Sequence, residues 1–292
     1  MSQNDLGQGR AIAERVERFV RDVIIPHEKD PRATSHGPTD ELVADLRGLA
    51  REAGLLTPHI GADGVHLSQR ATALVLQASG LSPLGPVALN VMAPDEGNMY
   101  LLGQVADAAQ KRRFLDPLTS GEARSAFFMT EPAEDDGAGA DPSMLKTVAI
   151  QDGDRWIING RKAFITGAVG AAVGILMART DAGDGKVAAT MFLVDLPDPA
   201  VQIERVMETI DSSMPGGHSV VVLDNLAVAS DQILGARVGR QQRLGAGGME
   251  TADEERRLDR RRRHHRDAAT TQGLVRHHRH HGRQVEFEGE GR

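Results

Sequence analysis

The chain of 292 residues is long enough to bury one large core or two ordinary ones, and it contains no cysteine, which excludes disulfides and thiolate chemistry. Its longest apolar stretch, about twelve residues at 167–178, is too short to cross a bilayer. The N-terminal residues also lack the apolar core of a signal peptide. We therefore expect a cytoplasmic protein with no membrane span.

The net charge of −7 conceals two unlike parts of the chain. Residues 1–236 contain 20 Lys and Arg against 32 Asp and Glu, a net of −12. Residues 237–292 contain 14 Arg, no Lys and 9 Asp and Glu, a net of +5, together with six of the 11 His. Such an asymmetry predicts a separate C-terminal segment from about residue 236.

The first 120 residues have the periodicity of amphipathic helices. Apolar residues recur three or four positions apart over 10–25, and Pro26 ends this pattern. Thr39 and Ser68 are predicted to cap a second and a third helix, which end at Gly54 and Gly80. Further helices are expected at 87–102 and 105–114. These elements predict an all-helical N-terminal domain over residues 1–122.

After Glu122 the pattern changes to short runs rich in β-branched, aromatic and Met residues. Strands are predicted at 125–130, 146–151, 155–158, 163–166, 174–179, 187–195, 201–207 and 219–223. Asn159-Gly160 between two such runs predicts a hairpin turn. Because no long helix separates the runs, we expect an antiparallel β domain over residues 123–235. The predicted fold class is α+β, followed by a disordered tail over 236–292.

Two stretches are candidates for ligand binding. Met129-Thr130-Glu131-Pro132 leads into a loop with glycines at 137 and 139, which either binds a phosphate through its backbone or forms a surface turn. A dinucleotide fingerprint is excluded, because Pro142 occupies the third glycine position and no helix follows. The second stretch, residues 161–166, has by its own pattern the character of an amphipathic strand.

Taken in order, five pieces of sequence resemble the FAD-dependent acyl-CoA dehydrogenase family over roughly residues 10–235. They are GQVADAAQKRRFLDPLTSGEARSAFFMTEP, GAGAD, GDRWIINGRKAFITG, ARTD and MFLVD. The stretch APDEGNMYLL is similar to the branch that includes the long-chain and branched-chain enzymes. The resemblance implies a helical N-terminal domain, a flavin-facing middle β domain and a reaction in fatty acid metabolism. That reaction is the α,β-dehydrogenation of an acyl-CoA thioester, with hydride transfer to N5 of FAD.

The resemblance also implies which residues bind the cofactor. Phe127, Met129 and Thr130 match the strand end that lies along the isoalloxazine ring, where backbone groups and the Thr130 hydroxyl bond the pyrimidine end. Phe164, Ile165 and Thr166 match the stretch on the other side of the ring. Gly139 and Ala140 match the loop that contacts the pyrophosphate. No metal ligand is implied.

The chain departs from the family pattern at three points. Residues 133–136, three of them acidic, separate Glu131-Pro132 from the glycine loop. Ala140 replaces the serine that contacts the pyrophosphate, a loss of about 0.5–1.5 kcal/mol for one neutral hydrogen bond. Phe164 replaces the usual stacking tryptophan but still presents an aromatic face.

In the family, the glutamate that removes the α-proton lies in a C-terminal helical bundle. The resemblance ends near Gly235, and the 56 residues 237–292 contain only 12 Ala, Val, Leu, Met and Phe, with no helical stripe. We therefore expect a truncated form with no catalytic residue, weak FAD binding and no turnover. Family partners are acyl-CoA and an electron-transfer flavoprotein, and the family is homo-oligomeric through the bundle that this chain lacks.

Three interpretations of residues 237–292 remain. A GC-rich gene read in a shifted frame produces abundant Arg, His, Gly and Ala without Lys, which favours a frameshifted segment. A nucleic-acid-binding arm is disfavoured because acidic residues lie among the arginines. A His-rich metal binder would resemble a purification tag. A non-catalytic scaffold or binding protein is the alternative for the whole chain.

Overall fold

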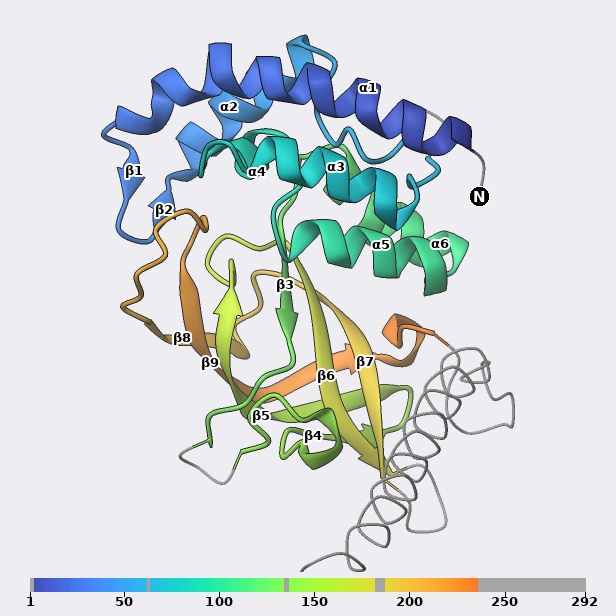
Figure 1. Ribbon diagram of the computed structural model, residues 1–292. Helices are drawn as coiled ribbons and strands as arrows, with labels where there is room; N and C mark the ends of the chain where they lie inside the picture. Colours follow the sequence, from blue (N-terminus) through green and yellow to red (C-terminus); the bar gives the residue numbers. More distant parts are fainter. Residues whose placement is uncertain (1–2, 62–63, 134–136, 182–186, 236–292) are drawn as a thin grey trace, which may run out of the picture. The chain divides into compact units, whose positions relative to one another are not determined.

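The computed structural model describes residues 3–61, 64–133, 137–181 and 187–235, and the tail predicted at 236–292 lies outside these ranges (Figure 1). The helices are α1 (Gln3–Phe19), α2 (Asp40–Glu52), α3 (Gln69–Ser79), α4 (Gly85–Ala88), α5 (Asp95–Val105), α6 (Ala108–Gln110) and α7 (Asp116–Thr119). Two π-helical turns, Val20–Ile24 and Lys111–Leu115, extend α1 and α6. Strands β1 (Ala33–Thr34) and β2 (Gly37–Pro38) form a small hairpin before α2. No helix within the described ranges combines the length and apolarity that a membrane crossing requires.

The helix starts predicted from capping residues are confirmed. The Thr39 hydroxyl accepts a hydrogen bond from the Leu42 N–H at 3.4 Å, and the Ser68 hydroxyl accepts one from the Ala71 N–H at 3.3 Å. Both bonds satisfy an N–H group that the first turn of a helix leaves without a partner. Behind the caps, α1 lies so close to α3 that a Cβ on Gly9 would approach the Cβ of Ala71 to 2.8 Å.

The single helix predicted over 87–102 is wrong. α4 ends at Ala88 and α5 begins only at Asp95. Between them Asn90 adopts a left-handed conformation with φ of 56°. Its side-chain amide donates to the Thr57 hydroxyl and to the Leu118 carbonyl, both at 2.8 Å. These buried bonds hold the break in the helix, and periodicity alone does not reveal them.

The second part is a seven-stranded sheet with the order β3-β6-β4-β5-β9-β8 and with β7 also paired to β6. Its strands are β3 (Ser125–Phe128), β4 (Val148–Asp152), β5 (Arg155–Thr166), β6 (Val173–Asp181), β7 (Val187–Asp195), β8 (Val201–Val206) and β9 (His218–Ala229). The predicted α+β organisation, helices followed by a β domain, is confirmed, but the sheet is mixed and not antiparallel, because β6 runs parallel to β3 and to β4. The hairpin β4–β5 lies between β3 and β6 in sequence and provides the long crossover that a parallel pair needs.

The predicted Asn159-Gly160 hairpin is also wrong. Both residues lie inside the continuous strand β5, where the pairing with β9 shifts by one residue. The Asn159 side chain accepts a hydrogen bond from the Asn225 N–H at 2.8 Å across this bulge. A Cβ on Gly160 would lie 2.4 Å from the Thr147 hydroxyl oxygen, so the glycine serves a close packing contact instead of a turn.

A buried polar cluster joins the helices to the sheet. Asp95, at the start of α5, accepts hydrogen bonds from the N–H and the hydroxyl of Ser125 in β3, each at 2.6 Å. The Arg47 guanidinium of α2 lies 3.5 Å from the other Asp95 oxygen and donates to the Gly121 carbonyl. Asn98 also donates to the Ser125 hydroxyl at 2.9 Å. Since Arg47 and Asp95 are about 95% buried, each charge depends on the other.

We predict that Asp95→Ala lowers the free energy of unfolding by about 3–5 kcal/mol, because it leaves the Arg47 charge buried without its partner. Urea denaturation measures the loss. Arg21→Ala, which breaks an exposed pair with Glu17, is the matched control and changes stability by less than about 1 kcal/mol. Equal effects of the two substitutions would contradict the role of the cluster.

Candidate functional site

The end of β3 is fastened to β5 by backbone and side-chain bonds. The Ala163 N–H donates to the Thr130 carbonyl at 2.9 Å. The Lys162 ammonium donates to the Met129 carbonyl at 3.0 Å and to a carboxylate oxygen of Glu131 at 3.1 Å. Residues 129–131 and 162–164, which are distant in sequence, therefore lie side by side. We call these six residues the β3–β5 edge.

Glu131 organises the loop that follows this edge. Its carboxylate accepts hydrogen bonds from the N–H groups of Ala138, Lys146 and Thr147, and from the Thr147 hydroxyl at 2.6 Å. Its own N–H donates to the Gly139 carbonyl. With the Lys162 ammonium, the carboxylate has five donors and is 2% exposed. One side chain thus holds both ends of the loop from 132 to 147.

The pKa values of this pair follow from its surroundings. Burial by itself would raise the pKa of Glu131, but the bonds from Thr147 and Lys146 and the Lys162 charge outweigh it and lower the pKa to about 2. Burial lowers the pKa of Lys162 to about 8, although Glu131 opposes this shift. Both groups are therefore charged at neutral pH.

We predict that Glu131 makes the chain acid-sensitive. Its pKa falls from 4.5 to about 2 on folding, so its stabilisation is complete above pH 4.5 and is lost as the pH falls toward 2. That shift corresponds to about 3 kcal/mol. The free energy of unfolding should fall less steeply between pH 5 and pH 3 in Glu131→Gln than in the parent chain. The other carboxylates are common to both proteins, so equal slopes would refute the assignment.

Phe164 projects from a bulge in the same edge. The register of β5 against β9 shifts between Lys162 and Ile165, and Phe164 within the shift has φ of 58°. Its side chain is 60% exposed, whereas Ile165 is 1% exposed and packs in the core of the sheet. A left-handed conformation costs a side-chain-bearing residue roughly 1–2 kcal/mol, and such strain gathers at functional sites.

We predict that this backbone strain makes glycine more stabilising than alanine at position 164, the reverse of the usual order in a strand. Phe164→Gly should be about 1 kcal/mol more stable to urea than Phe164→Ala, because only glycine adopts positive φ without cost. In an ordinary strand alanine is the better residue. An alanine variant as stable as the glycine variant would show that the bulge carries no strain.

The edge also presents donors that the described part of the chain leaves unused. The N–H groups of Met129 and Thr130 and the Thr130 hydroxyl donate to no other described residue. The N–H groups of Gly139 and Ala140 likewise have no acceptor among the described residues. Accessible donors without an acceptor in the described chain, together with an exposed aromatic ring, suit a ligand-binding surface.

Two further residues predicted to bind the cofactor, Phe127 and Thr166, make contacts of their own. Phe127 is half-buried and packs against the apolar cluster beneath α5. The Thr166 hydroxyl lies 2.9 Å from Nδ1 of His218 in β9, and the His218 ring lies 3.6 Å from Asp211. Sequence reasoning missed Glu131, Lys162 and His218 as contributors. Of these three, only Glu131 belongs to a run that the sequence singles out, Met129-Thr130-Glu131-Pro132.

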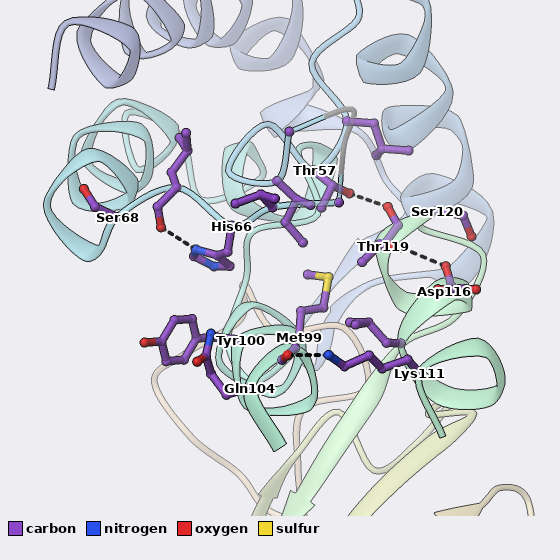
Figure 2. A pocket seen from close by; sticks show the side chains of 18 of the residues that line it. Thr57, His66, Ser68, Met99, Tyr100, Gln104, Lys111, Asp116, Thr119 and Ser120 are labelled. Carbon is purple, nitrogen blue, oxygen red and sulfur yellow. Dashed lines mark hydrogen bonds between the residues drawn. The ribbon is translucent and has the colours of Figure 1, made fainter. Parts of the chain in front are cut away.

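A cavity of about 880 Å³ lies elsewhere, within the helical part (Figure 2). Its walls are the loop 56–69, one side of α5 and residues 111–120. His66, Tyr100 and Gln104 line it, and the Lys111 ammonium on another wall donates to the Gly103 carbonyl at 2.6 Å. None of the eight residues predicted to bind the cofactor lines this cavity.

Comparison with known proteins divides the chain at the same place as its secondary structure. Residues 8–122 match the family model for the N-terminal domain of acyl-CoA dehydrogenase, and residues 126–226 match that for the middle domain. The chain is 30% identical over 258 residues to acyl-CoA dehydrogenase family member 11 of Gallus gallus. It is 32% identical over 223 residues to the probable acyl-CoA dehydrogenase FadE2 of Mycobacterium tuberculosis. The glutaryl-CoA dehydrogenase structure from Mycobacterium smegmatis is 27% identical, with a TM-score of 0.61.

These matches cover most of the chain but only part of each relative. They include 82%, 72% and 81% of this chain, respectively. They span 33% of the chicken protein, 54% of the M. tuberculosis protein and 57% of the solved M. smegmatis chain.

Proposed function

The chain belongs to the acyl-CoA dehydrogenase family through its N-terminal and middle domains, and we propose that its β3–β5 edge binds the isoalloxazine ring of FAD. The observation that carries the proposal is the row of unused donors at Met129 and Thr130 beside the exposed Phe164 ring. The enzyme type that this surface serves dehydrogenates an acyl-CoA thioester between its α and β carbons. An electron-transfer flavoprotein is the proposed electron acceptor.

The chemistry of the edge fits a flavin. The pyrimidine end of the ring offers oxygen and nitrogen acceptors, which the N–H groups of Met129 and Thr130 and the Thr130 hydroxyl would satisfy. Phe164 supplies an apolar, aromatic surface for the flat ring system. The N–H groups of Gly139 and Ala140, which have no acceptor among the described residues, would suit the negatively charged pyrophosphate. Bound FAD would supply the acceptor for a hydride from the substrate.

The other residues hold this surface in place. Lys162 and Glu131 fix the backbone of 129–131, so little order would be lost there when the ring binds. His218 bonds Thr166 and so fixes its hydroxyl at the end of β5. The donors of Met129 and Thr130 would hold the pyrimidine end of the flavin, and such donors favour an electron-rich ring.

We further propose that the 292-residue chain does not turn over acyl-CoA by itself. A base must remove the α-proton. Glu131, the buried carboxylate next to Thr130, has five hydrogen bonds and a pKa of about 2, so it is a poor base. Residues 237–292 contain too few apolar residues to pack the helical bundle in which the family resemblance places the catalytic glutamate.

We predict that the chain binds FAD weakly and that Phe164→Ala and Thr130→Ala each weaken binding by roughly two- to tenfold, since each loses one stacking or hydrogen-bonding contact. Titration of FAD fluorescence measures the dissociation constants. Ile150→Ala, which removes a 65% exposed side chain from β4, is the matched control and leaves the affinity unchanged.

Two results would contradict the proposals separately. Equal FAD affinities for the parent chain, Phe164→Ala and Thr130→Ala would place the flavin elsewhere. Stoichiometric FAD together with reduction of a dye acceptor by an acyl-CoA would refute the lack of turnover while leaving the location of the flavin intact.

A further inference from the structure

Two histidines and a glutamate converge beside the cavity of the helical part. His59 and His66 lie on the two arms of a turn in which the Leu67 N–H donates to the His59 carbonyl at 2.9 Å and Ile60 pairs with His66. Glu96 lies in the first turn of α5. One ligand atom of each side chain lies within 4.8 Å of those of the other two. Three residues from two separate elements thus meet at one point.

His59 is the unusual member of the group. Its side chain is 0% exposed, and neither ring nitrogen has a hydrogen-bond partner within the described chain. A neutral imidazole has one donor and one acceptor, so a buried ring with no partner loses the hydration of both. Structures rarely leave such a group unpaired without a ligand or another compensating role.

His66 is oriented as metal-bound histidines are. Its Nδ1 lies 2.7 Å from the Leu67 carbonyl, which fixes a proton on Nδ1 and leaves Nε2 free to coordinate. That Nε2 lies 3.3 Å from a carboxylate oxygen of Glu96, which is an ion pair when the ring is protonated, and a bound metal ion would take the place of that proton. Backbone anchoring of one ring nitrogen is the usual support of a metal ligand.

From this geometry we propose that His59, His66 and Glu96 form a binding site for a divalent transition metal ion such as zinc. Two imidazoles and one carboxylate are a common set of three protein ligands for zinc, with a fourth position for water. Imidazole ligands disfavour magnesium and calcium, which prefer oxygen.

The spacing requires little movement. Ligand atoms about 2.0–2.1 Å from a tetrahedral zinc ion lie about 3.3 Å apart. His66 and Glu96 already have this separation, so binding requires the ligand atom of His59 to move toward them by at most about 1.7 Å. The bound ion would join His59 and His66 to α5 and so stiffen the cavity wall that His66 and Tyr100 form.

The test is a calorimetric titration of the full 292-residue chain with zinc chloride. The six histidines at 264, 265, 277, 278, 280 and 281 are replaced by alanine in every protein, so that the tail does not bind the ion. This parent should bind one equivalent of zinc. His59→Ala, His66→Ala and Glu96→Gln should each weaken binding at least tenfold. His36→Ala, which changes a 38% exposed histidine outside the group, should bind as the parent does.

A second measurement distinguishes the loss of zinc binding from poor folding of a variant. At the same zinc concentration the melting temperature should rise less in Glu96→Gln, which keeps the size of the side chain, than in the parent and in His36→Ala. Cobalt bound to the parent should show the visible absorption of a tetrahedral site. A parent that binds no zinc, or three site variants that bind as tightly as the parent, would overturn the proposal.

Discussion

The buried ion pair of Glu131 and Lys162 holds the β3–β5 edge, on which the candidate site depends. Glu131 and Lys162 are 2% and 0% exposed, and either charge without the other would be strongly destabilising. Their mutual contact and the surrounding donors offset the cost of burial. The same two side chains also bond to the backbone: Lys162 donates to the Met129 carbonyl, and Glu131 accepts a hydrogen bond from the Thr147 N–H. Residues 129–131, 138 and 146–147 are therefore linked to one another through this pair.

The same edge contains two features that depart from local rules. Phe164 is strained at positive φ, and Met129 and Thr130 present N–H groups without acceptors in the described chain. The strain at Phe164 costs free energy in the isolated protein, whereas the partly exposed N–H groups can donate to water, and both features become useful when a flat ligand with acceptor atoms binds. Natural sequences depart from local rules mainly where function requires it. The departures here coincide with the residues that the family resemblance assigns to the flavin.

Features governed by neighbours in sequence were predictable. The Thr39 and Ser68 caps involve residues within one turn, so composition and spacing revealed them. The pair Glu131–Lys162 was missed because its partners are 31 residues apart and meet only through the fold. The parallel pairing of β3 with β6 was missed for the same reason.

Asn159-Gly160 shows how a local signal can mislead. The dipeptide has the sequence of a turn, but the pairing of β5 with β9 and the contact of Gly160 with Thr147 keep it within a strand. The closeness of Thr130 and Phe164 was expected only from the family resemblance. No spacing rule connects these two residues, and the bulge that exposes Phe164 is a property of the assembled sheet.

The central claim is that the unused donors at residues 129 and 130 bind the flavin. Hydrogen–deuterium exchange at these two amides, measured on the 292-residue chain with and without excess FAD, tests it most directly. The account predicts fast exchange in the free chain and marked protection with FAD, with little change at Ile150 on β4. Protection by FAD at other sites, with the amides of Met129 and Thr130 unaffected, would contradict it.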